Sequence, residues 1–234
     1  MTANHYDPRT IALLSEIIHP PLELEPKRAQ SIHNELYRHA QFSYQNFGVS
    51  HDGIQLGNQS DQPGYVSTVN FLSDRIQIRE ELSGAHVDDF CQRLVHVIGV
   101  ATEQLSLPIL VAQQHVVRSL ITPRSFNDSR DFLATAVCGL PSEDLSSFGR
   151  PAQLFGMKMI FPGTDNEPNM HTLRLESFNQ DSRSVFLENV ATFTNAVMPD
   201  NLDELAENMQ QTYSFVRKNA LEFLSRYDES GPTG

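Results

Sequence analysis

The longest regular pattern of hydrophobic positions in this 234-residue chain lies near its C-terminal end. Apolar side chains recur there at steps of three and four residues, which places them on one face of an α-helix. At a rise of about 1.5 Å per residue the helix would be roughly 40 Å long, enough to cross a whole sheet. Asp200 is the expected N-cap, with Asp203 three residues later. The predicted apolar face consists of Leu202, Leu205, Met209, Tyr213, Val216, Ala220, Phe223 and Tyr227.

Directly before this helix, a period of two predicts a β-hairpin. Side chains alternate in character through 173–176 and again through 185–188, as expected of half-buried strands. The polar sequence 179–182 between them is typical of a turn. One face of the hairpin should therefore pack against the helix. The predicted inner set is Leu173, Leu175, Val185 and Leu187, and the opposite set is Arg174, Glu176, Phe186 and Glu188.

The region before residue 107 shows similar patterns. A helix should begin near Pro26, because proline is tolerated in the first helical turn. Residues 1–9 are polar and are expected to be frayed. The buried face of the first helix should be Ala29, Ile32, Leu36 and Ala40. The remaining elements expected here are strands at 11–18, 42–49, 53–56, 66–72 and 75–82, and a helix at 86–105.

After Pro108 the order of elements starts again. A strand is expected at 109–121, and Asn127 or Asp128 can cap a helix that runs to 137. A turn-rich connection at 141–148 leads to a strand near 155, the hairpin and the long helix. Both parts of the chain therefore follow the order β-α-β-β-β-α.

This shared order suggests a tandem duplication of 1–107 and 108–234. Residues 47–49 align with 155–157, and 87–90 align with 202–205, once gaps are allowed. The alternative is two unrelated halves that share a common strand order, and either arrangement could form one continuous domain. The predicted fold class is α+β. A duplication would give two antiparallel sheets related by a pseudo-twofold axis, or one continuous sheet, with the long helices packed on one face.

Charge narrows the function classes. The formal net charge is −12, and the 17 basic residues are dispersed without a Lys/Arg run. An acidic chain of this kind repels phosphate backbones and anionic lipid, so we expect no direct contact with nucleic acid and no membrane binding. The N-terminal sequence lacks a basic segment followed by an apolar core, and no stretch approaches the roughly 20 apolar residues of a membrane span. We expect a soluble cytoplasmic protein.

The sequence assigns no catalytic, cofactor-binding or metal-binding residue, and no cofactor is expected. His33 and His39 should lie on different sides of a helix, whereas His86 and His96 could share a face. Glycine-rich phosphate loops and a Gly-x-Ser-x-Gly elbow are absent from the sequence. Two carboxylate pairs could support acid/base chemistry, although such charges more often lie exposed to solvent on the outer face of a sheet. They are Glu80 with Glu81, and Glu176 with Glu188, the latter beside Arg174.

Two cysteines cannot build a disulfide framework. Cys91 falls on the apolar stripe of the helix at 86–105 and is interpreted as a small buried hydrophobe. Cys138 is expected at the end of a helix. Neither has an obvious histidine partner in sequence that would activate it as a nucleophile.

A family resemblance covers most of the chain. It depends on the order of elements and on three segments: His19-Pro20-Pro21, the mid-chain segment 117–121, and 173–176 before the final helix. Together they resemble the sporadically distributed, uncharacterised bacterial proteins that share a PP start and a central RYIN-like segment. This resemblance implies an α+β protein of unknown activity with a patchy, mobile-element or defence-like distribution. It implies no catalytic residue.

Two function classes follow. The first is a non-enzymatic protein-protein interaction or assembly protein that forms a homo-oligomer or holds a protein partner. The alternative is a small-molecule-binding sensor or enzyme with an apolar cavity between the sheet and the C-terminal helix. An enclosed cavity of roughly 300 Å³ or more would favour the second. We expect at least a dimer, because Phe186 and Val190 place apolar surface on the hairpin face away from the helix.

Overall fold

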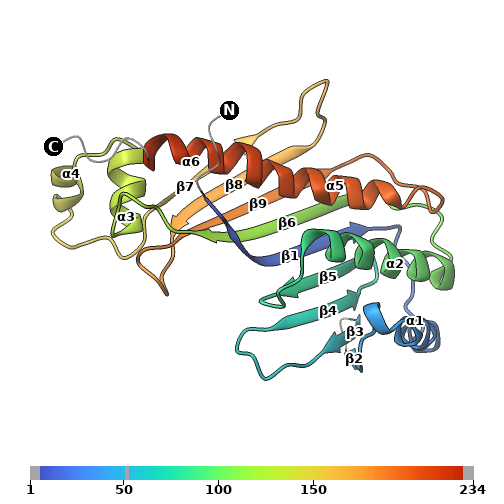
Figure 1. Ribbon diagram of the computed structural model, residues 1–234. Coiled ribbons are helices and arrows are strands. Elements are labelled where there is room, and N and C mark those ends of the chain that lie inside the picture. The colour runs from blue at the N-terminus through green and yellow to red at the C-terminus, as the bar shows by residue number, and fades with distance from the viewer. Residues whose placement is uncertain (1–5, 51–52, 229–234) are drawn as a thin grey trace.

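The computed structural model describes residues 6–50 and 53–228, and its centre is a nine-stranded antiparallel sheet (Figure 1). The strand order is β2-β3-β4-β5-β1-β6-β9-β8-β7. The α+β prediction with an antiparallel sheet is therefore confirmed. The strands are β1 (Arg9–Ile18), β2 (Asn46–Ser50), β3 (Gly53–Asn58), β4 (Val66–Phe71), β5 (Arg75–Glu81), β6 (Ala112–Ile121), β7 (Gly156–Phe161), β8 (Met170–Ser177) and β9 (Val185–Phe193).

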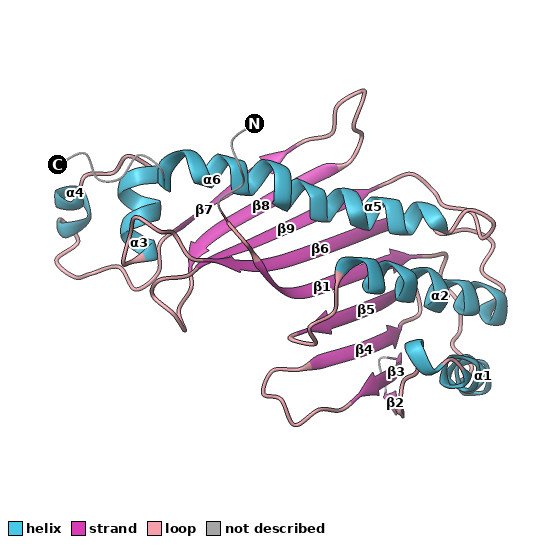
Figure 2. Ribbon diagram, viewed as in Figure 1, coloured by secondary structure: helices cyan, strands magenta, loops and turns pink. Residues whose placement is uncertain are grey.

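The helices lie on one face of this sheet (Figure 2). Helix α2 packs over β1 and β5, and α5 packs over β6 and β9. None of the helices in the described part of the chain is long and apolar enough to cross a membrane. The helical segments are α1 (Pro26–Arg38), η1 (Ala40–Phe42), α2 (Val87–Leu105), α3 (Ser129–Asp131), η2 (Phe132–Val137), α4 (Ser142–Ser146), α5 (Asp203–Ser214), η3 (Phe215–Ala220) and α6 (Leu221–Asp228).

The core forms where the two sequence periods meet. Along each strand every second side chain points toward the helices, and the predicted inner set of the β8–β9 hairpin is buried. On α1 the predicted residues Ala29, Ile32 and Leu36 are buried, whereas Ala40 lies beyond the helix in η1. The helices thus cover the sheet with the faces that the spacing predicts.

The two halves of the chain share this one sheet. From the central pair β1 and β6 outward, the first half has the order β5, β4, β3 and the second half β9, β8, β7. Each half therefore places its strands in the same sequence order, and β2 is an additional strand at the edge of the first half. This topology is compatible with a duplication of 1–107 in 108–234, which remains a hypothesis. The predicted alignment of 47–49 with 155–157 does not fit it, because the strand that occupies the place of β7 in the first half is β3 and not β2.

The long C-terminal helix is interrupted by a π-helical turn, η3. Leu205, Met209, Val216 and Ala220 are buried as predicted, but beyond the turn the buried positions are Leu221, Leu224 and Asp228. The prediction of Phe223 and Tyr227 is off by one residue because a π-turn inserts one residue into the helix and rotates everything after it.

The predicted cap of this helix is wrong. The helix begins at Asp203, its N-cap is Leu202, and the N-cap makes no side-chain hydrogen bond. Asp203 and Glu204 instead occupy the first turn, where their negative charges favour the positive end of the helix dipole. Asp200 lies in the preceding turn.

Asp228, the last residue of α6, links this helix to two distant segments of the chain by hydrogen bonds. Its carboxylate accepts hydrogen bonds from the Tyr6 hydroxyl, the Arg124 backbone N–H and the Ser125 backbone N–H, each at 2.8 Å. Tyr6 and Asp228 are both buried. The prediction that the chain is frayed up to residue 9 is therefore wrong from Tyr6 onward. Residues 1–5 and 229–234 lie outside the described residues.

We expect Asp228→Ala to lower the free energy of unfolding by roughly 1–3 kcal/mol, because it leaves buried donors unpaired. Burial acts to raise the pKa of the Asp228 carboxyl, but the hydrogen bonds from Arg124, Ser125 and Tyr6 bring it below its usual value. Its contribution to stability should thus be complete above about pH 4 and be lost as the pH falls through the lowered pKa. Thermal melts at several pH values measure this. An equal effect of Glu222→Ala, at an exposed carboxylate on the same helix, would contradict it.

Candidate functional site

The helices leave the opposite face of the sheet without a helical cover (Figure 2). An apolar row crosses it, because residues on five adjacent strands lie directly opposite one another. Most of these side chains are half-buried. We call this surface the open face. The row runs Leu14, Val116, Val190, Thr172 and Ile160, from β1 to β7, and Thr172 is its polar member.

A charged row runs beside the apolar row. The Arg118 guanidinium lies 2.6 Å from Glu188 and 3.5 Å from Glu81, and the Arg174 guanidinium lies 3.3 Å from Glu188. Glu176 is 3.9 Å from Arg174. The predicted cross-strand neighbours Arg174, Glu176 and Glu188 are confirmed, and arginines separate the carboxylates. This alternation is the geometry of an ion-pair ladder, in which each exposed pair contributes little by itself.

Phe186 does not provide the exposed apolar surface that the sequence suggested. Its side chain points to the open face but is only 8% exposed. The Arg174 guanidinium lies 5.1 Å from its ring centroid, and Phe178 stacks on it from the β8–β9 turn. Val190 is half-buried. These two residues therefore give less support to a dimer than expected, because Phe186 is almost fully buried and Val190 is half-buried.

Glu80 and Glu81 do not form a carboxylate pair. Adjacent residues of a strand point to opposite faces, so Glu81 lies on the open face and Glu80 is buried under the helices. Glu80 accepts a hydrogen bond from Ser67 at 2.8 Å and lies 3.5 Å from Arg93, whose guanidinium lies 5.3 Å from the Tyr44 ring centroid. Burial raises the pKa of Glu80, although Arg93 and Ser67 oppose this, and burial raises the pKa of Tyr44 to about 12.

A buried polar cluster lies between α5 and the centre of the sheet. Ser15 Oγ is 2.7 Å from His115 Nδ1, and His115 Nε2 is 2.8 Å from Gln113 Oε1. An amide oxygen only accepts, so Nε2–H donates to Gln113 and Nδ1 accepts from the Ser15 hydroxyl. The order hydroxyl, imidazole and orienting group matches that of a nucleophilic site. His115, however, is 0% exposed and Met209 lies against Ser15, so no substrate can reach the serine.

A second buried cluster holds η3 on the sheet. His171 Nδ1 is 3.2 Å from Asn189, and the Asn189 amide donates to the Thr212 carbonyl at 3.0 Å. The Phe215 ring stacks on His171 with centroids 4.0 Å apart. Burial lowers the pKa of His171, opposed by its bond to Asn189. Neither cluster was predicted from the sequence. Their signal is a polar residue at an inward position of a strand, as at 113, 115, 171 and 189.

The histidine and cysteine predictions have mixed outcomes. His86 precedes α2 as its N-cap, so it does not share a helical face with His96. The His96 ring instead contacts His39, which lies just after α1. Cys91 is buried, as predicted, and burial raises its pKa to about 12. Cys138 follows η2 and is exposed. The described ranges 6–50 and 53–228 contain no group of three or more His, Cys, Asp or Glu side chains that could hold a metal ion.

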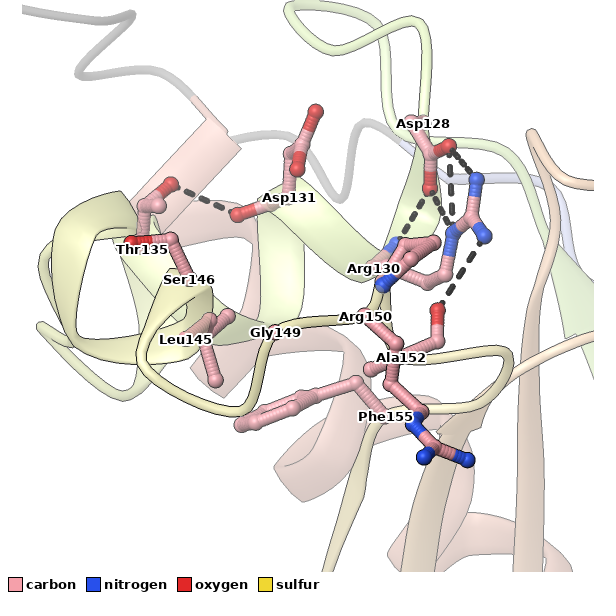
Figure 3. A pocket seen from close by; sticks show the side chains of 11 residues that line it. Asp128, Arg130, Asp131, Thr135, Leu145, Ser146, Gly149, Arg150, Ala152 and Phe155 are labelled. Carbon is pink, nitrogen blue, oxygen red and sulfur yellow. Dashed lines mark hydrogen bonds and ion pairs between the residues drawn. The ribbon is translucent and has the colours of Figure 1, made fainter.

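A pocket of about 660 Å³ opens beside α3, η2 and α4 (Figure 3). Asp128 caps α3 and is paired with the Arg130 guanidinium, which also donates to the Ala152 carbonyl at 3.2 Å. The bond to Arg130 is the main cause of the lowered pKa of Asp128, against the effect of burial. The pocket wall includes Phe155 and Leu145. The Asp128 carboxylate is thus already paired with Arg130, and the lining also contains a second carboxylate, Asp131.

Comparisons with known proteins give no family. No protein-family model matches the chain, and no curated protein matches it. Among solved structures, one match is the aspartate kinase of Clostridium acetobutylicum, with 8% sequence identity and a TM-score of 0.23. The match covers 89% of this chain and 34% of the kinase chain, so this chain spans about a third of that protein's length.

Proposed function

We propose that this chain is a non-enzymatic protein-protein interaction or assembly protein that uses the open face and the edges of its sheet. One observation supports it most. All the packing helices lie on one side of a nine-stranded sheet, so the other side presents a continuous surface of apolar and charged rows. A surface on which apolar and charged rows lie side by side has the composition of protein interfaces.

The space between sheet and C-terminal helix also favours this proposal over a small-molecule sensor or enzyme. Leu205, Met209 and Val216 fill that space and are almost completely buried. The 660 Å³ pocket lies elsewhere and is open to solvent. A sensor with an apolar cavity under α5 would need these side chains to move aside.

The proposal includes a setting. We place the protein in the bacterial cytoplasm, within a mobile-element or defence-like system, with a protein partner or a second copy as its ligand and without direct contact to nucleic acid or membrane. The free cysteines Cys91 and Cys138 suit a reducing compartment. The net charge of −12 disfavours nucleic acid and anionic lipid.

A charge placed on the open face tests the function. Val190→Lys introduces a cation in the apolar row, whereas Gln211→Lys makes the same charge change on the solvent side of α5. We expect Val190→Lys to reduce partner recovery at least about tenfold, equivalent to roughly 1.4 kcal/mol, and Gln211→Lys to leave it unchanged.

The measurement is affinity purification of tagged full-length chain from the native host with quantitative mass spectrometry. Thermal melts of both variants confirm that they are folded. Equal recovery of every enriched protein with wild type and Val190→Lys would reject the open face as the binding surface.

A further inference from the structure

The two ends of the sheet differ in one respect. In the first half, β2 pairs with β3 and covers its outer side. Strand β7 holds the corresponding place in the second half, since it is the third strand outward from β6 as β3 is from β1. No strand of the described ranges pairs with the outer side of β7. The second half thus lacks the strand that completes the first.

The outer side of β7 exposes backbone hydrogen-bonding groups. The Phe155 carbonyl accepts from the Ser177 N–H, so Phe155 bonds toward β8. In an antiparallel strand, the backbone groups of every second residue bond to the same neighbouring strand. The backbone N–H and C=O groups of Met157, Met159 and Phe161 therefore also point toward β8. The N–H and C=O groups of Gly156, Lys158 and Ile160 then point away from the sheet. Such a row is a template for another strand.

Exposed apolar side chains gather at this edge. Ile160 is 59% exposed, and Leu154, Phe161 and Met170 are also exposed large hydrophobic residues. Natural edge strands are commonly protected by charges, proline or bulges. Within β7 the only charge is Lys158, and the strand contains neither proline nor a register shift. The edge is thus poorly protected against pairing.

We propose that β7 pairs antiparallel with β7 of a second copy of this chain, about a twofold axis perpendicular to the sheet. This inference rests on the proposed assembly function and names its partner and surface. The two nine-stranded sheets join into one continuous sheet, with the helices of both copies on the same side. A second copy is favoured because an isologous contact satisfies both free β7 edges at once and closes.

The side chains select a register with Met159 on the axis. Because the side-chain period is two, only registers that keep like faces together are allowed. A register centred on Lys158 would place two lysines directly opposite, which is destabilising. The register centred on Met159 places Lys158 opposite Ile160 and Met157 opposite Phe161. The last pair brings a thioether to an aromatic ring, a favourable contact.

Charges beyond the strand agree with this register. The connection 162–169 after β7 extends past the end of the sheet (Figure 1) and carries Asp165 and Glu167. Antiparallel pairing brings this connection of one copy beside residues 150–155 of the other. Arg150, an exposed cation, lies there. Opposite charges therefore meet at both ends of the paired strands.

The experiment compares matched substitutions at the two edges of the sheet. Ile160→Lys adds a charge on β7, and Val49→Lys adds it on β2 at a side chain of nearly equal exposure, 58% against 59%. We expect light scattering after size exclusion, from about 5 to about 200 µM, to show wild type and Val49→Lys approaching twice 26.4 kDa. Ile160→Lys should stay near 26.4 kDa, with dimer affinity reduced at least about tenfold.

Cross-linking supplies a second readout that needs no loss of stability. In a Cys138→Ser background, Met159→Cys should form an intermolecular disulfide on mild oxidation, since the two axis positions form a non-hydrogen-bonded pair with Cα atoms about 4.5 Å apart. Phe161→Cys, which would face position 157 of the second copy, should not.

The outcomes separate this inference from the proposed function. A monomeric wild type at the highest concentration overturns the β7 dimer, whereas partner capture by the open face is unaffected. A dimer that resists Ile160→Lys and gives no Met159→Cys cross-link also overturns it, while homo-oligomer assembly through another surface stands.

Discussion

Val216→Asp unfolds the protein or leaves it insoluble, whereas Lys218→Asp leaves its stability nearly unchanged. Val216 is 1% exposed in η3 and packs into the core, while Lys218, two positions later, is exposed. A carboxylate at 216 would be buried without a partner, which belongs to the most destabilising class of substitution and costs more than about 4 kcal/mol. That is comparable with the roughly 5–15 kcal/mol by which domains are stable.

Chemical denaturation and the yield of folded protein measure this difference. Val216→Ala is a milder control, which removes two methyl groups and should cost roughly 1–3 kcal/mol without unfolding the chain. If Val216→Asp melted at the temperature of Lys218→Asp, the C-terminal helix would not pack on the sheet through this face.

Acid weakens the wild-type protein through His115, and His115→Gln removes this part of the pH dependence. Burial lowers the pKa of His115 to about 3, from about 6.5 when exposed. Above pH 6.5 the imidazole is neutral in both states and costs nothing. As the pH falls from 6.5 toward 3, only the unfolded chain takes up the proton, so the free energy of unfolding falls by about 1.4 kcal/mol per pH unit.

The groups against this imidazole are neutral. They are Ser15 and Gln113 at its nitrogens and the ring of Phe193, 5.7 Å away between centroids. Asp228 and His171, whose pKa values are lowered, also make the folded protein less stable as the pH falls. Glu80, whose pKa is raised, makes it more stable as the pH falls. These groups are common to wild type and variant, so the difference between the two curves isolates His115.

Urea denaturation at intervals between pH 4 and pH 8 gives both curves. Below pH 6.5 the free energy of unfolding should depend more steeply on pH for wild type than for His115→Gln, by the equivalent of up to about one bound proton. Above pH 6.5 the two curves should be parallel. Parallel curves throughout would show that His115 has the same pKa in the folded and the unfolded protein.

Sequence patterns were sufficient for properties that depend on local spacing. The steps of three and four in α1 and α5 identify the helix faces, and the period of two identifies which side of β8 and β9 is buried. They failed where one residue changes the phase. The π-turn at η3 moves burial from Phe223 and Tyr227 to Leu224 and Asp228. Asp228 in the last turn is polar, so the hydrophobic pattern could not predict its burial. It is held by Tyr6, Arg124 and Ser125, which are distant in sequence.

The candidate surface divides in the same way. Alternation along β8 and β9 places Arg174 and Glu188 on one face, and hence the open face was predictable as a polar one. The ion pairs of Arg118 with Glu81 on β5 and Glu188 on β9 were not predictable from the sequence. The shielding of Phe186 by Arg174 was not predictable either. The sealed Ser15–His115–Gln113 cluster joins residues about 100 positions apart.

The sequence by itself thus determined the α+β class, the order of elements and the buried side of most of them, because hydrophobic period is a property of the local backbone geometry. Only the tertiary structure decided that β1 lies between β5 and β6, and that β7 is left at an edge. Side-chain period specifies a face and never a neighbour. The neighbour is chosen by backbone hydrogen bonds between strands such as Arg9–Ile18 and Ala112–Ile121, together with the helices that must cover the resulting sheet.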